Sequence, residues 1–112
     1  MTVVTDDYMR DILSKSKAYT VVLLKATPKL SAPGSDAVVW EHGRRNLSLR
    51  ADGLLAIILP ITDGSGWSGV AVFDADSETV AGIMNDDPGV QAGIFSYEIH
   101  GTRSFPGDAL PQ

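Results

Sequence analysis

Four strand-like segments separated by two helical patterns constrain the fold of this chain more than any other feature of its sequence. The segments 19–26 (YTVVLLKA), 54–61 (LLAIILPI), 69–75 (GVAVFDA) and 93–100 (GIFSYEIH) are rich in β-branched, leucine and aromatic residues. Helical patterns cover 35–51, behind Ser35 or Asp36 as a cap, and 76–86, which ends at an Asp-Asp-Pro step. The β-α-β-β-α-β order predicts a ferredoxin-like α+β domain.

The strands are apolar on both sides, most clearly in VVLL (21–24) and LLAII (54–58). Right-handed crossovers place both helices on one face of the antiparallel sheet, so the helices can cover only that face. A second sheet packed against the other face would cover it. We therefore expect a homodimer in which two sheets face each other.

The two ends of the chain fall outside the predicted β-α-β-β-α-β segment. Residues 6–15 (DDYMRDILSK) bring Met9, Ile12 and Leu13 to one side at helical spacing, behind a possible Asp cap. We expect this helix to pack on the main domain. Residues 101–112 contain two prolines and no period, which is typical of an extended arm. The predicted organisation is an N-terminal extension (1–18), one domain (19–100) and a C-terminal arm (101–112).

Composition and charge exclude several function classes. The net charge is −5, which offers no general attraction to nucleic acid or to anionic membranes. No run approaches the ~20 apolar residues of a membrane span, and the N-terminus does not read as a signal peptide, so a cytoplasmic protein is expected. The chain has no cysteine, its two histidines lack metal-site spacing, and no strand is followed by a phosphate-binding loop. We expect neither a metal nor a cofactor.

The predicted topology brings several reactive and pocket-forming residues to one end of the domain. They are Lys25 at the end of the first strand, His42 early in the first helix, Leu59 and Pro60 at the end of the second strand, Trp67 before the third strand, and Asp87 after the second helix. An aspartate bonded to one ring nitrogen of a histidine orients the ring and stabilises its protonated form. The other nitrogen is then free to exchange a proton with a substrate. His42 and Asp87 are accordingly the candidate catalytic pair.

Four pieces of the sequence resemble one known family. They are VVLLKATP (21–28), Trp40-Glu41-His42 with Gly53-Leu54-Leu55 beginning eleven residues after the histidine, LAIILP (55–60), and the long stretch 69–99 (GVAVFDADSETVAGIMNDDPGVQAGIFSYEI). From Tyr19 to about Ile99 the chain resembles the YciI-like (YCII-related) proteins of the dimeric α+β barrel superfamily. The resemblance implies a dimeric α+β barrel in which His42 and Asp87 occupy the positions of the proposed active-site pair. It implies no such role for Asp86.

The chain also departs from the family pattern. Leu59-Pro60 stands where the family usually has Gly-Pro, so a bulkier residue reshapes the expected pocket. The first helix is richer in polar residues, with Arg44, Arg45 and Asn46. Members of the family are mostly uncharacterised and have been proposed to be small-molecule enzymes, so the resemblance implies a fold and a site more firmly than a reaction.

Each candidate residue also has a structural interpretation. A single helical histidine is more often a surface or core residue than a catalyst, and Asp87 before a proline can simply cap a turn. Lys25 can be a surface lysine or bind a substrate carboxylate, and Trp67 can be a pocket wall or fill a dimer seam. Two functions therefore stay open. One is a cofactor-independent enzyme that uses His42 and Asp87 for proton transfer in an isomerisation or elimination, and the other is a non-catalytic dimeric module that binds a small ligand or a protein.

Overall fold

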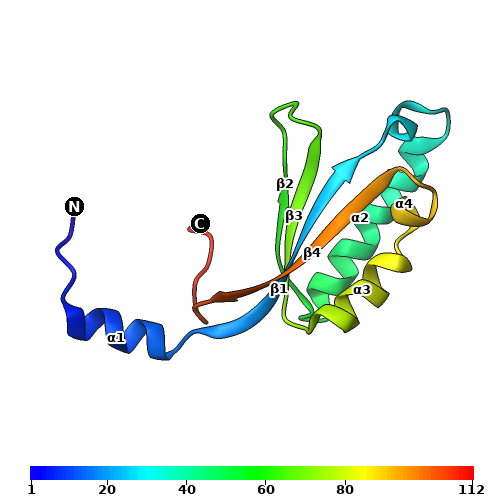
Figure 1. Cartoon of the computed structure of the whole chain (residues 1–112). Coiled ribbons are helices and arrows are strands. Elements are labelled where there is room, and N and C mark those ends of the chain that lie inside the picture. Colours follow the sequence, from blue (N-terminus) through cyan, green and yellow to red (C-terminus); the bar gives the residue numbers. More distant parts are fainter.

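A four-stranded antiparallel sheet with helices on one face forms the body of the protein, and the computed structural model describes residues 1–112 (Figure 1). The strands are β1 (Lys17–Ala26), β2 (Leu55–Pro60), β3 (Trp67–Phe73) and β4 (Phe95–Ser104), in the order β2-β3-β1-β4. The helices α2 (Ser35–Ala51) and α3 (Ser77–Asn85) cover one face. This arrangement confirms the ferredoxin-like α+β fold, with β1 central and the proline-ended β2 at an edge.

Local signals explain where the two long helices begin and end. The Asp76 carboxylate accepts a hydrogen bond from the Thr79 amide at 2.8 Å and caps α3. The α2 helix instead begins after Gly34 in the left-handed conformation (φ 84°), without a side-chain cap. The expected cap at Ser35 is absent because its hydroxyl donates to the Leu30 carbonyl at 2.6 Å, in the 3₁₀ helix η1 (Pro28–Ser31). Gly53 (φ 82°) follows the end of α2, as its position in the sequence predicts.

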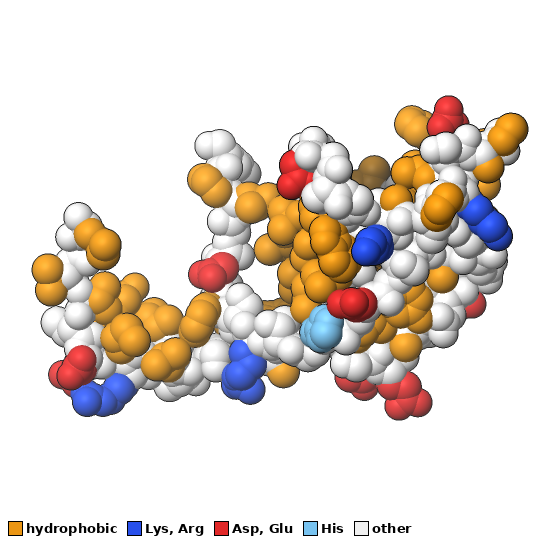
Figure 2. Space-filling view, turned by 45° about the horizontal axis from the view of Figure 1, so that its top comes forward, with side chains coloured by type: hydrophobic (Ala, Val, Ile, Leu, Met, Phe, Trp, Pro, Cys, Tyr) orange, Lys and Arg blue, Asp and Glu red, His pale blue; other side chains and the backbone are white.

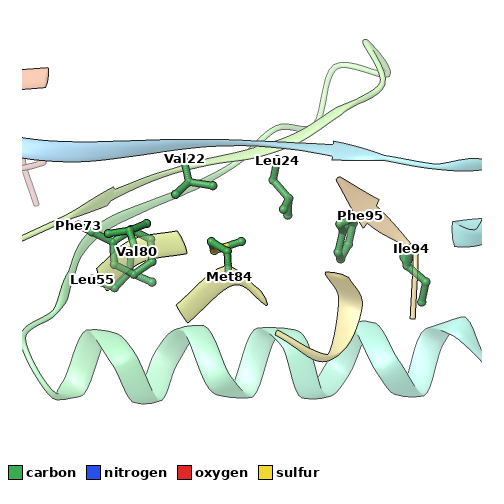
Figure 3. Packing of buried hydrophobic residues seen from close by; sticks show 8 residues of the cluster. All are labelled: Val22, Leu24, Leu55, Phe73, Val80, Met84, Ile94 and Phe95. Carbon is green, nitrogen blue, oxygen red and sulfur yellow. The ribbon is translucent and has the colours of Figure 1, made fainter. Parts of the chain in front are cut away.

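The hydrophobic core lies between the sheet and the helices (Figure 3). Alternate residues of the strands point into it, as the two-residue period of a strand requires. Its eight buried side chains are Val22, Leu24, Leu55, Phe73, Val80, Met84, Ile94 and Phe95. Only 12 of the 112 residues are buried, so one chain leaves much of its apolar surface uncovered.

A short helix, α4 (Pro88–Gln91), follows α3 and was not predicted from the sequence. The Asp87-Pro88 step ends α3 and also begins α4, with Asp87 as the N-cap and the proline at the first helical position. The turn after α4 leads directly into Phe95 at the start of β4. Asp87 is thereby held at the junction of two helices.

The predicted boundaries of the first and last strands and the expected position of the first helix were wrong. β4 continues through residues 101–104, which were expected in an extended tail, and these residues pair with the start of β1. The pairing of β1 with β3 begins at Thr20, which lies opposite Phe73, so Lys17–Tyr19 and Thr102–Ser104 form a two-stranded ribbon beyond the rest of the sheet. The helix α1 (Asp6–Ser14), capped by Thr5 rather than by an Asp, sits at the end of this ribbon and has no buried residue. We call the ribbon and residues 1–16 the arm, which projects away from the domain (Figure 1).

No helix of the structure is both long enough and apolar enough to cross a membrane.

Candidate active site

A hydrogen-bonded histidine–aspartate pair joins α2 to the junction of α3 and α4. Nδ1 of His42 lies 2.8 and 2.9 Å from the two carboxylate oxygens of Asp87. The side chains are 12% and 1% exposed, respectively, so the pair is largely shielded from water. The two residues are 45 positions apart in the sequence, and the ferredoxin-like topology brings them together.

The position of Asp87 is fixed by its role as a helix cap. Its Oδ2 accepts hydrogen bonds from the amides of Gly89 at 2.9 Å and Val90 at 3.1 Å, at the N-terminus of α4. A Cβ at position 89 would lie 2.5 Å from the Phe95 ring and 3.1 Å from the same Asp87 oxygen. Residue 89 therefore has to be a glycine, because the aspartate and Phe95 pack directly against its backbone.

These contacts keep the Asp87 carboxylate ionised. Burial raises the pKa of this carboxyl, but the hydrogen bond and the charge of His42, with the Val90 and Gly89 amides, outweigh burial and leave the pKa below its ordinary value. Arg45 adds a second cation, with its Nη1 3.8 Å from Asp87 Oδ1. The same nitrogen donates to the Ile83 carbonyl at 2.7 Å and so links α2 to α3 beside the pair.

The second ring nitrogen of His42 faces a different partner. An ionised carboxylate only accepts hydrogen bonds, so the ring proton of neutral His42 belongs on Nδ1, next to Asp87. Nε2 then carries a lone pair, and the Asn46 amide nitrogen lies 3.3 Å from it. The Phe95 ring packs against the imidazole with the ring centres 4.8 Å apart, which fixes the ring plane. His42 is thereby prepared to accept a proton at Nε2.

A largely apolar groove of about 890 Å³ runs along the histidine, between α2 and strands β2 and β3. Its lining includes the site residues His42, Asn46 and Phe95, and most of the remaining surface is hydrocarbon. Its apolar lining residues include Val39, Trp40, Leu47, Ile58, Pro60 and Met84. Polar groups other than His42 and Asn46 come from Asp36, Arg44 and Ser68. A groove of this size can accept a small, mostly apolar molecule whose polar group meets His42.

The structure brings only some of the expected binding residues to this groove. Pro60 lines the groove, whereas Lys25, Leu59 and Trp67 do not. Lys25 and Trp67 pair across β1 and β3, and the ammonium lies 5.3 Å from the centre of the indole. Because successive strand residues point to opposite faces, Lys25 next to the buried Leu24 faces away from the helices. Asp86 is exposed and lies outside the pair.

Sequence reasoning missed four residues that build the site. Asn46 lies one helical turn after His42, and this spacing on one helix face could have identified it. Arg45, Gly89 and Phe95 left no comparable signal, because their roles depend on contacts between elements distant in the sequence. No group of three or more His, Cys, Asp or Glu side chains is placed to hold a metal ion.

The fold and the site define a ferredoxin-like α+β protein with a buried histidine–aspartate pair beside an apolar groove. No family model matches the chain, and no curated protein matches it. Among solved structures, the chain is similar to 5-chloro-2-hydroxyhydroquinone dehydrochlorinase (TftG) from Burkholderia phenoliruptrix AC1100, in complex with 2,5-dihydroxybenzoquinone. The TM-score is 0.50 at 19% sequence identity, and the match covers 73% of this chain and 90% of the other. This likeness independently supports the fold.

Proposed function

We propose that the protein is a cofactor-independent enzyme that uses His42 and Asp87 for general acid–base proton transfer on a small cyclic or carbonyl-bearing molecule. The observation that carries the proposal is that the two nitrogens of the His42 ring have different partners. Asp87 holds Nδ1 at 2.8 Å, Nε2 lies 3.3 Å from the Asn46 amide nitrogen, and both His42 and Asn46 line the apolar groove. A ring held in this way is a base at Nε2 and becomes an acid once protonated.

The proposed reaction needs only these residues. Nε2 of His42 removes a proton from a carbon or hydroxyl of the substrate, and the electron pair left behind moves into an adjacent carbonyl or expels a leaving group. Asp87 stabilises the imidazolium formed in this step. The imidazolium then returns the proton to a different atom of the substrate in an isomerisation, or releases it to water after an elimination. Asn46, displaced from Nε2, can donate a hydrogen bond to the substrate oxygen on which charge develops.

Two related likenesses support acid–base chemistry at this pair. TftG is named a dehydrochlorinase, and its structure contains a ring compound with two hydroxyl and two carbonyl oxygens. The resemblance of 19–99 to YciI-like proteins assigns the proposed active-site pair to the positions of His42 and Asp87. We infer that hydroxylated or oxo-substituted rings are the substrate class to test first.

We also propose that the protein acts as a homodimer through the uncovered face of its sheet. Val21, Leu23, Ile57 and Val72 alternate with core-facing residues, and none of the four is buried in the single chain. Packing this face against a second sheet would remove it from water. Sedimentation at micromolar concentration is expected to give twice the chain mass of 11.9 kDa, and a monomer would contradict this proposal.

The experiment that tests the proposed chemistry is an NMR screen in deuterated water. Purified protein is incubated with cyclic ketones, enols, hydroquinones and hydroxylated benzoquinones, including 5-chloro-2-hydroxyhydroquinone and 2,5-dihydroxybenzoquinone. An acid–base enzyme is expected to exchange carbon-bound hydrogen for deuterium, or to eliminate a leaving group, in at least one compound. If compounds bind in the groove without exchange or elimination, the alternative of a non-catalytic small-ligand module is the better account.

A further inference from the structure

The arm carries an amphipathic helix that covers nothing in its own chain. Its apolar side chains Tyr8, Met9, Ile12 and Leu13 follow the spacing of one helix face. Three of them are about half exposed, with Tyr8 at 57%, Met9 at 49% and Leu13 at 54%. A helix of nine residues gains little stability alone in water, and most helical stability comes from packing an apolar face. This helix therefore requires a partner surface.

The arm is held away from the domain by specific contacts. The ribbon that supports α1 continues the sheet through the pairs Lys17–Ser104 to Tyr19–Thr102. Arg103 donates to the hydroxyl of Ser16 at 3.0 and 3.1 Å and to its carbonyl at 3.1 Å, and Lys17 forms an ion pair with Asp74 at 3.0 Å. These contacts hold the chain from Ser16 onward in the ribbon, and no residue of α1 is buried against its own domain. Its partner surface is thus supplied from outside the chain.

The apolar surface of the arm and the apolar surface of the sheet lie on the same side of the molecule. In Figure 2, hydrophobic side chains gather on the arm at the left and over the strands at the centre, with an open hollow between them. The arm is a continuation of β1 and β4, and the C-terminal segment (105–112) rises between α1 and the uncovered sheet face (Figure 1). A single partner molecule that covers the sheet can therefore also contact α1.

The accessible surface area of the chain indicates how large the interface with this partner is. The accessible surface is 7669 Å², about 1,700 Å² more than the roughly 6,000 Å² of a compact monomer of this mass. The radius of gyration is 16.4 Å, compared with ~13 Å for a compact domain of this length. Covering the excess on two chains would bury ~3,400 Å² in total, within the ~2,000–5,000 Å² of obligate homodimers.

The charge of α1 argues against a membrane or nucleic acid as the partner. The helix and the following lysine contain three acidic residues (Asp6, Asp7 and Asp11) and two basic ones (Arg10 and Lys15). Anionic lipid surfaces and phosphate backbones repel such a segment, and the net charge of −5 adds to this repulsion. A second copy of the chain offers the uncharged apolar surface that α1 requires.

We infer that α1 is an intersubunit clasp, whose apolar face packs on a second copy of this chain while the arm of that copy packs on the first. In a twofold dimer the two contacts are equivalent, so each arm extends the interface made by the sheets. The inference rests on the proposed homodimer and is independent of the proposed chemistry.

Site-specific photocrosslinking in the full chain tests the clasp. p-Benzoylphenylalanine replaces Met9 on the apolar face or, as the matched control, Asp7 on the opposite face, where the side chain is 98% exposed. Each variant is mixed with isotope-labelled wild-type chain and irradiated. We expect position 9 to give a crosslink between labelled and unlabelled chains, at least 10-fold more abundant than from position 7. Crosslinks only within one chain, or equal yields from both positions, would overturn the clasp.

A second pair of variants measures what the clasp contributes. Leu13→Gln removes an apolar side chain from α1, and Ser14→Gln makes a neutral change at the next, polar position. No residue of α1 is buried in the single chain, so neither change disturbs the domain. The dimer Kd is expected to rise ~10-fold or more in Leu13→Gln and to stay within ~2-fold in Ser14→Gln. A dimer that is unaffected by Leu13→Gln would overturn the clasp alone, whereas a monomeric wild-type protein would overturn both the clasp and the homodimer.

Discussion

Asn46 and His42 lie one helical turn apart on α2, with the amide nitrogen of Asn46 3.3 Å from the His42 nitrogen that Asp87 leaves unbound. The imidazole is therefore contacted on both sides, by an acceptor at Nδ1 and by a donor at Nε2. This asymmetry gives the two nitrogens different tasks. Substitutions of Asn46 and of Asp87 can therefore test the two nitrogens separately.

Replacing the donor with an acceptor should inactivate the base. In Asn46→Asp, a carboxylate next to Nε2 would favour a proton on that nitrogen and prevent it from accepting one. Turnover of a substrate found by the screen is expected to fall ~10²-fold or more, as for loss of a general base. Asn46→Ala only removes the donor and should reduce kcat less than Asn46→Asp does. If steady-state kinetics give equal kcat values for both variants, Asn46 does not control the state of Nε2.

The proton of the neutral His42 ring should reside on Nδ1. A ¹⁵N–¹H correlation spectrum of the imidazole reports which ring nitrogen is protonated, without requiring a substrate. We expect the Nδ1–H tautomer in the wild-type protein, because the carboxylate of Asp87 accepts this proton. A mixture of the two tautomers is expected in Asp87→Ala, where the acceptor is removed. A wild-type ring protonated on Nε2 would contradict the assignment of Nε2 as the base.

The Asp87 carboxylate should make folding stability depend on pH in one direction. Its pKa is below the ordinary value of 3.8, so its stabilising contribution is present above that value and is lost as the pH falls through the lower pKa of the folded state. Asp87→Asn is expected to lower the free energy of unfolding by about 2–4 kcal/mol at pH 7, since it removes the charge of a buried carboxylate that accepts hydrogen bonds from His42, Gly89 and Val90. Urea unfolding at pH 7 and at pH 3 measures the difference between the two proteins, which should shrink at the lower pH. A difference that grows with acidity would mean that the carboxyl is protonated in the folded protein.

Glycine should be required at position 89 for steric reasons. In Gly89→Ala, the new methyl group would lie 2.5 Å from the Phe95 ring and displace either that ring or the Asp87 carboxylate. A loss of about 1–3 kcal/mol in stability is expected, as for overpacking elsewhere. Gly82→Ala in α3 is the matched control, since nothing lies within 4 Å of its new carbon and alanine favours a helix. Thermal unfolding that gave the two variants the same midpoint would show that Gly89 is not closely packed.

The order of the elements could be predicted from the sequence because the strand and helix periods are clear and the topological rules are restrictive. The proximity of His42 and Asp87 followed from that order, because the start of α2 and the end of α3 lie at one end of such a domain. The hydrogen bonds between them depend on α4, which the sequence did not reveal. A helix of four residues has too few positions to establish a period.

The errors in the predicted pocket arise from the two faces of a strand. Leu59 and Pro60 are neighbours in β2, so they cannot both point into one groove, and the structure assigns Pro60 to it. An irregularity in the pairing of β1 and β3 next to Lys25 matches that residue with Trp67, away from the groove. The ribbon was not predicted because Gly101–Ser104 lacks alternating apolar residues. Those residues are held by pairing with β1 rather than by burial of a face.

The most direct measurement of the central claim is the rate of proton transfer by wild-type protein and by His42→Ala. The compound with the fastest exchange or elimination in the screen serves as substrate, and circular dichroism and sedimentation verify that the variant is folded and assembled. We predict that His42→Ala retains the fold, because His42 is not one of the eight residues of the hydrophobic core, and loses ~10²- to 10⁴-fold in rate. A folded His42→Ala protein with the wild-type rate would contradict the assignment of His42 as the acid–base residue.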